Sequence, residues 1–395
     1  MPSKAQPGDQ LQQDAVLSAF RSQFGRPARL FRAPARVNII GEHTDYNAGL
    51  VMPANANLHT WLAIALRTDR VVRIRTANFD EIVEVSLENL SPTPGGGWQE
   101  YPKAVFHVLQ NEGFSLRGAD ILIVGEVPLN SGLSSSAALE VVTGFAMLSC
   151  LGEDVNRRRL AESCQQAENE FVGMSCGIMD QYVISLCERN RAMMLDCRSL
   201  EYELVPLLTK ARLLIVNSGV SRRLRDSSYN SRHKECEMAT ARLAELLPAV
   251  RSLRDVSREQ LDSCRRSLDE TTYLRSRHVI SENDRVRSAL QAIHNDDQVT
   301  LGKIISASHA SLKTDFEVSC DELDALVDIA MSCEGVYGSR MVGAGFGGCT
   351  VTVVDSVRVD QVTGEICSKF EQRFGFVPWY HLLDTCDPVH ELPVQ

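Results

Sequence analysis

The sequence predicts a mixed α/β (α+β) protein built from two domains. Its 395 residues exceed what one ordinary hydrophobic core organises. Strand-like apolar runs are frequent in the first half, whereas the second half is rich in helical sequence with many Arg and Glu residues. This change in composition divides the chain into predicted domains 1–210 and 211–395.

In the first half, predicted strands and helices follow one another. Residues 1–15 are polar and rich in Gln, Pro and Gly, so we expect a frayed end. The predicted strands have apolar residues that alternate or run together, with many β-branched side chains, and they cover 61–66, 71–75, 82–85 and 121–124. Apolar residues at helical spacing predict helices over 98–109, 134–151 and 157–171, and the Pro- and Gly-rich residues 92–97 predict a plain loop.

Further predicted strands lie on both sides of the predicted boundary, at 192–197, 202–207 and 213–216. A long helix-rich region follows from residue 226 to about 333. No internal repeat of the solenoid kind is present in the sequence.

Composition and charge exclude several classes of protein. The 41 Lys and Arg against 51 Asp and Glu give a net charge of −10, which repels nucleic acid and anionic membranes, so we expect neither as a partner. An anionic ligand would have to be bound by a local device. No signal-peptide core or membrane-length apolar run is visible, and the twelve cysteines form no CxxC pair. We therefore expect a cytoplasmic protein with free thiols and without structural zinc.

The first motif with chemical content is VPLNSGLSSSAA, residues 127–138, which joins a predicted strand to a predicted helix. Unpaired N–H groups at such a helix start, with serine hydroxyls beside them, attract phosphate. The segment lacks the Gly-Lys-Ser/Thr of a Walker A loop and is not GxGxxG. Taken alone, it fits a phosphate-binding loop and a serine-capped helix equally well.

The second motif is RVNIIGEHTDYN, residues 36–47, which groups Arg36, Glu42, His43 and Asp45 around a glycine. Carboxylates and an imidazole on one loop can accept and donate hydrogen bonds to sugar hydroxyls. One histidine with two carboxylates at these positions gives no recognisable metal-ligand spacing. A solvated polar turn is the alternative interpretation.

Two further segments are rich in glycine. In ENEFVGMSCGIMDQ, residues 168–181, Asp180 lies among apolar residues, where a carboxylate needs a cationic partner such as Arg36, although Asp180 could also cap the following helix. In MVGAGFGGCTV, residues 341–351, four glycines precede an apolar strand. They permit either a close approach of the backbone to a ligand or another loop, or a tight hairpin.

Together and in this order, the four segments resemble those of the galactokinases, in the GHMP small-molecule kinase superfamily. The resemblance runs from residue 32 to about 354, with 36–47 similar to the galactokinase signature, 128–138 to the ATP loop and 341–350 to the third motif. It implies a two-domain GHMP fold with the active site in the interdomain cleft. It also implies phosphorylation of the anomeric hydroxyl of galactose, with ATP and Mg²⁺.

The resemblance also implies roles for individual residues. Arg36 and Asp180 correspond to the catalytic pair. Both of them also belong to the residues that match sugar-binding positions, which are Arg36, Glu42, His43, Asp45, Gly177, Asp180 and Tyr229. The residues that match nucleotide-binding positions are Trp98, Tyr101, Gly132, Leu133, Ser134, Ser135, Ser136 and Ala137. Ser136 and Glu168 match the metal-side groups. For Trp98 and Tyr101, ordinary packing of a helix face is the alternative.

Three departures from the family pattern bear on the nucleotide site. Ala35 and Ala344 stand where the family usually has Gly, and Asn130-Ser131 replaces a Gly pair. If any of these positions needs a positive φ, the side chain costs about 1 kcal/mol of local strain and weakens nucleotide binding.

The expected mechanism is phosphoryl transfer in which Arg36 offsets charge on the transferred group and Asp180 orients the sugar hydroxyl and accepts its proton. The alternatives are a GHMP kinase for N-acetylgalactosamine or galacturonate, and a non-catalytic sensor of galactose and ATP. The sequence does not determine the oligomeric state, and we expect a monomer.

Overall fold

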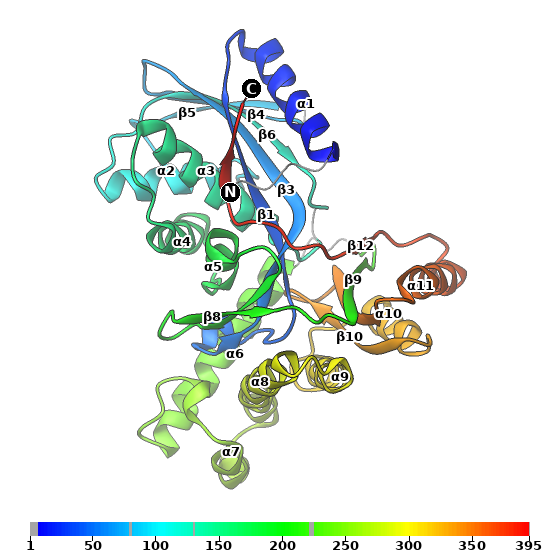
Figure 1. Ribbon diagram of the computed structural model, residues 1–395. Helices are drawn as coiled ribbons and strands as arrows, with labels where there is room; N and C mark the ends of the chain where they lie inside the picture. The colour runs from blue at the N-terminus through cyan, green and yellow to red at the C-terminus, as the bar shows by residue number, and fades with distance from the viewer. Residues whose placement is uncertain (1–6, 79–80, 129–130, 221–224, 395) are drawn as a thin grey trace.

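The computed structural model describes residues 7–78, 81–128, 131–220 and 225–394. It combines α-helices with three β-sheets, of six, four and three strands, in two halves joined by long strands (Figure 1). The mixed architecture that the sequence predicts is confirmed. Among the described residues, no helix combines the length and the apolar composition needed to span a bilayer.

The six-stranded sheet forms the frame of the upper half in Figure 1. Its strands, in spatial order, are β13 (His390–Leu392), β1 (Arg29–Asn38), β3 (Pro53–Leu66), β6 (Ala119–Gly125), β4 (Val71–Thr76) and β5 (Glu81–Ser86). All pairs are antiparallel except β4 with β6. The strands expected at 61–66, 71–75, 82–85 and 121–124 are therefore confirmed, and β13 brings the end of the chain back to the first strand.

Alternation along the strands places helices on both faces of this sheet. Leu30, Trp61 and Leu122 pack with Phe20 of α1 (Pro7–Phe24) on one face. The neighbouring side chains, Phe31 among them, point to the other face and into the core beneath the remaining helices. Those helices are α2 (Glu100–Asn111), α3 (Ser135–Leu151), α4 (Arg157–Gln166) and α5 (Met179–Leu186).

Two helical segments differ from what the sequence predicts, one at residues 7–15 and one at residues 157–171. The frayed end expected over residues 1–15 is wrong for 7–15, which belong to α1, because the apolar side chains later in this helix cover the sheet. Residues 1–6 lie outside the described part of the chain. The helix expected over 157–171 is present as α4 followed by a π-helical turn, Ala167–Val172, that ends at Gly173.

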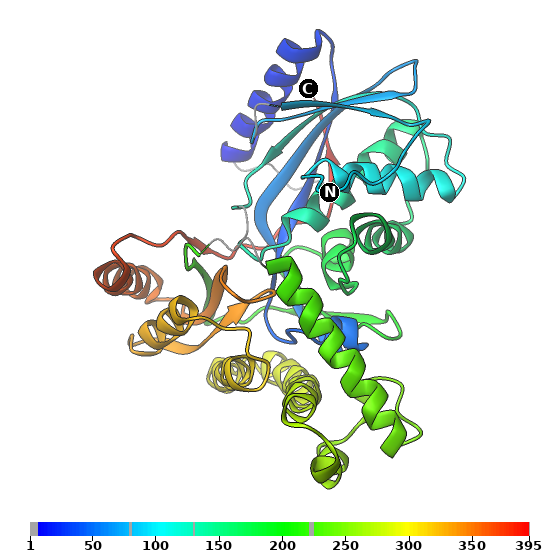
Figure 2. The ribbon, with the colours of Figure 1, turned by 180° about the vertical axis from the view of Figure 1, so that it is seen from behind.

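The lower half is built on the four-stranded antiparallel sheet. Its strands are β10 (Val336–Val342), β11 (Cys349–Asp355), β9 (Ala211–Asn217) and β12 (Tyr380–Leu382), in that order. The α-helices of this half are α6 (Arg225–Leu246), α7 (Arg258–Cys264), α8 (Glu270–His294), α9 (Gln298–Thr314), α10 (Asp321–Met331) and α11 (Val359–Phe374). Figure 2 shows α6 running from the junction of the two halves along the lower one. The helix-rich region expected from 226 to 333 is confirmed.

Short elements complete the chain. The third sheet consists of β2 (Leu50–Val51), β7 (Arg191–Asp196) and β8 (Tyr202–Pro206). The single-turn 3₁₀ helices are Asp45–Asn47, Leu253–Asp255 and Arg265–Ser267.

Strand β1 connects the two halves. Its first part packs in the core of the upper half through Phe31 and Ala33, whereas Ala35 and Val37 pack in the core below the six-stranded sheet. The register against β3 shifts between Pro34 and Ala35, at the point where the strand passes from one core to the other. The end of β1 therefore places the motif at 36–47 at the junction of the two halves.

The division at residue 210 stays a prediction. Strand β13, at the end of the chain, pairs with β1 in the upper half, so the two halves are not simply residues 1–210 and 211–395.

Helix α9 and strand β10 pack closely enough that only glycine fits. A Cβ on Gly302 would lie 2.2 Å from the carbonyl oxygen of Tyr337. We expect Gly302→Ala to lower the free energy of unfolding by roughly 1–3 kcal/mol, because the clash outweighs the gain in helix propensity. Gly364→Ala on α11, where a Cβ meets nothing within 4 Å, should instead raise it by about 0.5–1 kcal/mol. Urea denaturation measures both, and equal stability of the two variants would contradict this packing argument.

Candidate active site

Two cavities adjoin at the junction of the halves. The larger, of about 770 Å³, and the smaller, of about 250 Å³, share Tyr101, Ser135, Ser136 and Met174 in their walls. The predicted site residues that line the smaller cavity are Arg36, Glu42, His43, Asp45, Tyr101, Gly132, Ser134, Ser135, Ser136, Glu168, Gly177, Asp180 and Tyr229. Trp98 lines the larger one together with the shared residues. The four sequence motifs therefore meet in one place.

An ion pair between Arg36 and Asp180 lies in the wall of the smaller cavity. Arg36, on β1, donates from Nε to Oδ1 and from Nη2 to Oδ2 of Asp180, both at 2.7 Å. Its third nitrogen, Nη1, donates to the carbonyl oxygen of Gly132 at 2.6 Å. Burial lowers the pKa of Arg36, but the carboxylate of Asp180 outweighs this effect and the pKa is raised. Arg36 is thus a fixed positive charge beside Asp180, which lies in the first turn of α5.

Ser134 joins the phosphate-loop motif to this ion pair. It precedes α3 and adopts a left-handed conformation, with φ 61° and ψ 51°. This conformation is unusual for a residue other than glycine, and it is characteristic of functional sites. The Ser134 hydroxyl donates to Oδ2 of Asp180. Asp180 is therefore held by three charge-assisted hydrogen bonds, two from Arg36 and one from Ser134.

The Glu42 carboxylate is buried and held in place by the protein itself. Its Oε2 accepts from the side-chain amide of Asn38 at 3.0 Å, and its Oε1 accepts from the backbone N–H of Gly343 at 2.8 Å. Arg340 also contacts Oε1 at 3.2 Å. The glycine-rich segment at 341–351 thus approaches the second motif closely, and it also connects the paired antiparallel strands β10 and β11, so it fits both interpretations that the sequence left open.

His43 is an uncharged histidine in the cavity wall. Burial, followed by the charges of His278 and Arg232, lowers its pKa to about 3. Its Nδ1 lies 2.8 Å from the hydroxyl of Tyr46. Its Nε2 is buried and has no hydrogen-bond partner among the described residues, and an interaction with the backbone of Ala344 opposes the lowering of the pKa.

Asp45 and Gly177 are in close contact in the wall of the smaller cavity. A Cβ on Gly177 would lie 2.2 Å from Oδ2 of Asp45, so only glycine permits this approach. Burial raises the pKa of Asp45 to about 7, and the nearby charge of Asp180 adds to the rise. Asp45 therefore exchanges its proton near neutral pH, and a ligand that donates hydrogen bonds would favour the ionised form.

The start of α3 faces both cavities through Ser135 and Ser136. Exposed N–H groups and the helix dipole at such a start favour an anion. The side chains of Leu133 and Ala137 are fully buried in hydrophobic cores and line neither cavity, so at these two positions only backbone groups could contact a nucleotide.

Glu168 lies beside the serines, at the smaller cavity. Its Oε2 accepts from Gln181 at 2.8 Å, and the same Gln181 nitrogen donates to the buried Glu140 at 3.0 Å. Burial raises the pKa of Glu168, while the side chains of Cys176 and Ser136 oppose the rise. A carboxylate that is costly to ionise alone, next to a hydroxyl, suits a hard cation that arrives with phosphates. Among the described residues, no three Asp, Glu, His or Cys side chains form a ready metal cluster.

The larger cavity has an aromatic wall. Trp98 and Tyr101 line it, and the indole Nε1 of Trp98 is buried without a partner in the described part of the chain. Residues 92–97 form the loop expected from the sequence, but they also line this cavity, which the sequence did not indicate.

The departures at Ala35 and Ala344 carry no left-handed strain, because neither residue has a positive φ. Ala35 belongs to β1, and Ala344 lines the smaller cavity. The third departure includes Asn130, which lies outside the described residues. The strain that these two alanines could have caused is therefore absent.

Some wall residues were missed by the sequence analysis. Met174 lies in both walls, and Cys176 lies in the wall of the smaller cavity, where its thiol donates to Glu168 at 3.2 Å. Their place within the glycine-containing segment 168–181 was the available signal. Asn78 lines the larger cavity and exchanges hydrogen bonds with Gly125, and no local pattern marks it.

Comparison with known proteins defines the class first. Residues 100–188 match the GHMP kinases N terminal domain and residues 289–372 the GHMP kinases C terminal domain. The mevalonate kinase of Methanococcus jannaschii has the same fold, with a TM-score of 0.67 at 16% identity over 91% of this chain and 99% of that one. The chain is thus a GHMP-type kinase, which implies ATP as a substrate.

The particular family follows from closer relatives. Residues 18–66 match the galactokinase galactose-binding signature. Galactokinases of Halalkalibacterium halodurans and Roseiflexus sp. are 38% and 40% identical, over 95% and 94% of this chain and 97% and 95% of theirs. A structure of Lactococcus lactis galactokinase complexed with galactose has a TM-score of 0.93 at 35% identity, covering 96% of this chain and all of that one. The chain belongs to the galactokinase family.

Proposed function

We propose that this protein transfers the terminal phosphoryl group of ATP to the anomeric hydroxyl of galactose, yielding galactose 1-phosphate and ADP. The observation that carries the proposal is the Arg36–Asp180 pair in a small polar cavity that opens onto a larger, aromatic-walled one. The small cavity receives the sugar, and the larger one receives the nucleotide. The shared wall at Ser135 and Ser136 is where the phosphates meet the sugar.

Sugar binding uses groups already fixed in the cavity. Glu42, His43 and Asp45 come from one loop, Gly177 permits the approach of Asp45, and Tyr229 closes the wall from α6. The unpartnered Nε2 of His43 and the carboxylate of Asp45 bond sugar hydroxyls. Such a site rejects an analogue that leaves its buried polar groups unpaired.

The transfer step depends on position and charge. Asp180 orients the anomeric hydroxyl and accepts its proton as the bond from that oxygen to phosphorus forms and the bond to the ADP oxygen breaks. Arg36 offsets negative charge on the transferred group and fixes the orientation of Asp180. The N–H groups at the start of α3 hold the phosphates, and the aromatic wall with Trp98 and Tyr101 holds the adenine.

Ser136 and Glu168 would hold Mg²⁺ on the phosphates. When bound, this ion supplies positive charge that neutralises the triphosphate and lowers the cost of ionising Glu168.

The protein acts as a monomer in the cytoplasm.

A substrate panel with ATP tests the proposed function. We expect the highest kcat/KM for galactose, with N-acetylgalactosamine and galacturonate at least about tenfold lower. Galacturonate would bring a negative charge among Glu42, Asp45 and Asp180, and the acetamido group needs space in a cavity of about 250 Å³. The measurement is ADP release. Faster turnover of either analogue would assign a different sugar, and binding of galactose and ATP without ADP release would assign a sensor.

Replacing the proposed proton acceptor tests the mechanism. Asp180→Asn should lower kcat by roughly 10²–10⁴-fold, because the amide cannot take the proton, while galactose affinity changes only a few-fold. Asp196→Asn is the matched control, since Asp196 also pairs with an arginine, Arg254, and is no part of either cavity wall. Turnover by Asp180→Asn close to that of the control would refute the proton-acceptor role.

Galactose affinity should depend on pH near neutrality. The pKa of Asp45 is raised to about 7, and sugar hydroxyls favour its ionised form. Affinity should therefore rise as the pH increases from about 6 to 8, with proton release on binding below pH 7. Isothermal titration calorimetry in buffers of different ionisation enthalpy measures both effects. Asp45→Asn should bind weakly with little pH dependence, and a wild-type affinity that is constant across this range would contradict the assignment.

A further inference from the structure

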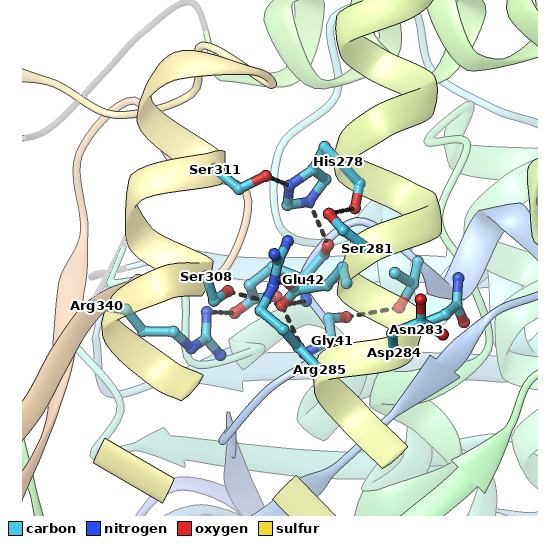
Figure 3. Close-up of polar contacts among 12 residues, drawn as sticks. Gly41, Glu42, His278, Ser281, Asn283, Asp284, Arg285, Ser308, Ser311 and Arg340 are labelled. Carbon is cyan, nitrogen blue, oxygen red and sulfur yellow. Dashed lines mark hydrogen bonds and ion pairs between the residues drawn. The ribbon is translucent and has the colours of Figure 1, made fainter. Parts of the chain in front are cut away.

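Four buried side chains of the lower half form hydrogen bonds or an ion pair with the loop that carries Glu42, His43 and Asp45, or with the residues at its two ends. Three of them, His278, Glu282 and Asn283, are on α8, and the fourth, Arg340, is on β10. All four are buried, with at most 3% of their surface exposed, and none lines either cavity. We call these four residues the loop anchor. Figure 3 shows His278 and Arg340 approaching the segment with Gly41 and Glu42 from two sides.

Glu282 is the centre of the loop anchor. Its Oε1 accepts from the backbone N–H of Gly41 at 3.1 Å and of Glu42 at 3.4 Å, and from the Ser308 hydroxyl at 2.7 Å. Its Oε2 accepts from Nε of Arg285 at 2.6 Å. Two N–H groups of the loop therefore donate to the same carboxylate oxygen. Hydrogen bonds to a carboxylate are stronger than hydrogen bonds to a neutral acceptor.

The other anchor residues hold the same loop at further points. Asn283 accepts from the backbone N–H of Leu50 at 2.7 Å, at the far end of the loop. His278 Nε2 lies 3.1 Å from the carbonyl oxygen of Glu42, which can only accept, so this nitrogen carries the proton. Arg340 donates to the carbonyl of Ile39 at 3.0 Å and contacts the Glu42 carboxylate at 3.2 Å.

The loop needs this support because its backbone is irregular. Gly41 has φ 98° and His43 has φ 62°, and residues 41–44 form no helix or strand that would pair their polar groups. A buried N–H without a partner costs about 1–3 kcal/mol, so the carboxylate of Glu282 stabilises one arrangement of the loop over others. That arrangement is the one in which Glu42, His43 and Asp45 all face the smaller cavity.

We infer that Glu282 is a positioning residue for sugar recognition: without touching the sugar, it fixes the loop that binds it. The inference rests on the proposed function, because it assigns the smaller cavity to galactose. It separates the two substrates, since Glu42, His43 and Asp45, which the anchor holds, line the smaller cavity and are not in the described wall of the larger one. Loss of the anchor charge should therefore weaken galactose binding and leave ATP binding unchanged.

The test compares Glu282→Gln with Asp284→Asn. Asp284 is two residues away on α8 but exposed, and among the described residues its side chain pairs with Arg287 alone, on the same helix. We expect Glu282→Gln to raise the KM for galactose about tenfold or more, with the KM for ATP within about twofold of wild type. Asp284→Asn should match wild type in both constants. Galactose should also raise the melting temperature of Glu282→Gln less than that of wild type at equal sugar concentration.

The outcomes separate the two proposals. Wild-type protein that does not phosphorylate galactose would refute the proposed function, whatever the variants do. An active wild type with an unchanged galactose KM in Glu282→Gln, or with equal rises in both KM values, would overturn the positioning role. If Glu282→Gln does not fold, Ser308→Ala decides, because it removes one donor to the same oxygen. A selective rise in galactose KM supports the inference, and its absence overturns it.

Discussion

The ion pair between the buried Arg36 and the partly buried Asp180 is the interaction on which the site depends. It connects β1, which passes between the two cores, to the first turn of α5, and its remaining bonds reach the segment before α3 through Gly132 and Ser134. An arginine buried here would be costly without a carboxylate, and the carboxylate would be costly without the arginine. Each group therefore fixes the other, and with them the three elements that surround the proposed point of phosphoryl transfer.

The charge balance of the smaller cavity explains the shifted proton affinities around this pair. Glu42, Asp45, Glu168 and Asp180 all line it, and Arg36 is the one cationic side chain in its described wall. Burial and mutual repulsion therefore raise the pKa of Asp45 and of Glu168. The net charge of −10 describes mainly the exterior of the protein. In the smaller cavity, carboxylates also outnumber cationic side chains among the described wall residues. An ATP-binding site of this composition needs a cation beside the phosphates, which is the physical basis for expecting Mg²⁺ at Ser136 and Glu168.

Local sequence patterns were enough to predict most strands and helices and to mark the four segments that line the two cavities, because alternation, glycines and clustered polar groups are visible over a few positions. Contacts between distant segments were not predictable in this way. Helix formation at residues 7–15 follows from packing of α1 against Trp61 and Leu122. Asp45 contacts Gly177, and Gly41 donates a hydrogen bond to Glu282. Both contacts join segments that are more than a hundred residues apart in the sequence. Family resemblance supplied the roles, which no periodicity indicates.

The two cavities differ in what holds their walls. The described wall of the larger one comes entirely from residues 60–230, with aromatic and glycine-rich surfaces that require little fixed polar geometry. The smaller one, which we propose receives the sugar, must distinguish hydroxyls, so its acceptors and donors need a single arrangement, and its loop is bonded by side chains of α8 and β10 from the other half. On this proposed assignment, sugar recognition depends on the contact between the two halves. Nucleotide binding then depends mainly on the upper half, so the two substrates place different demands on the same fold.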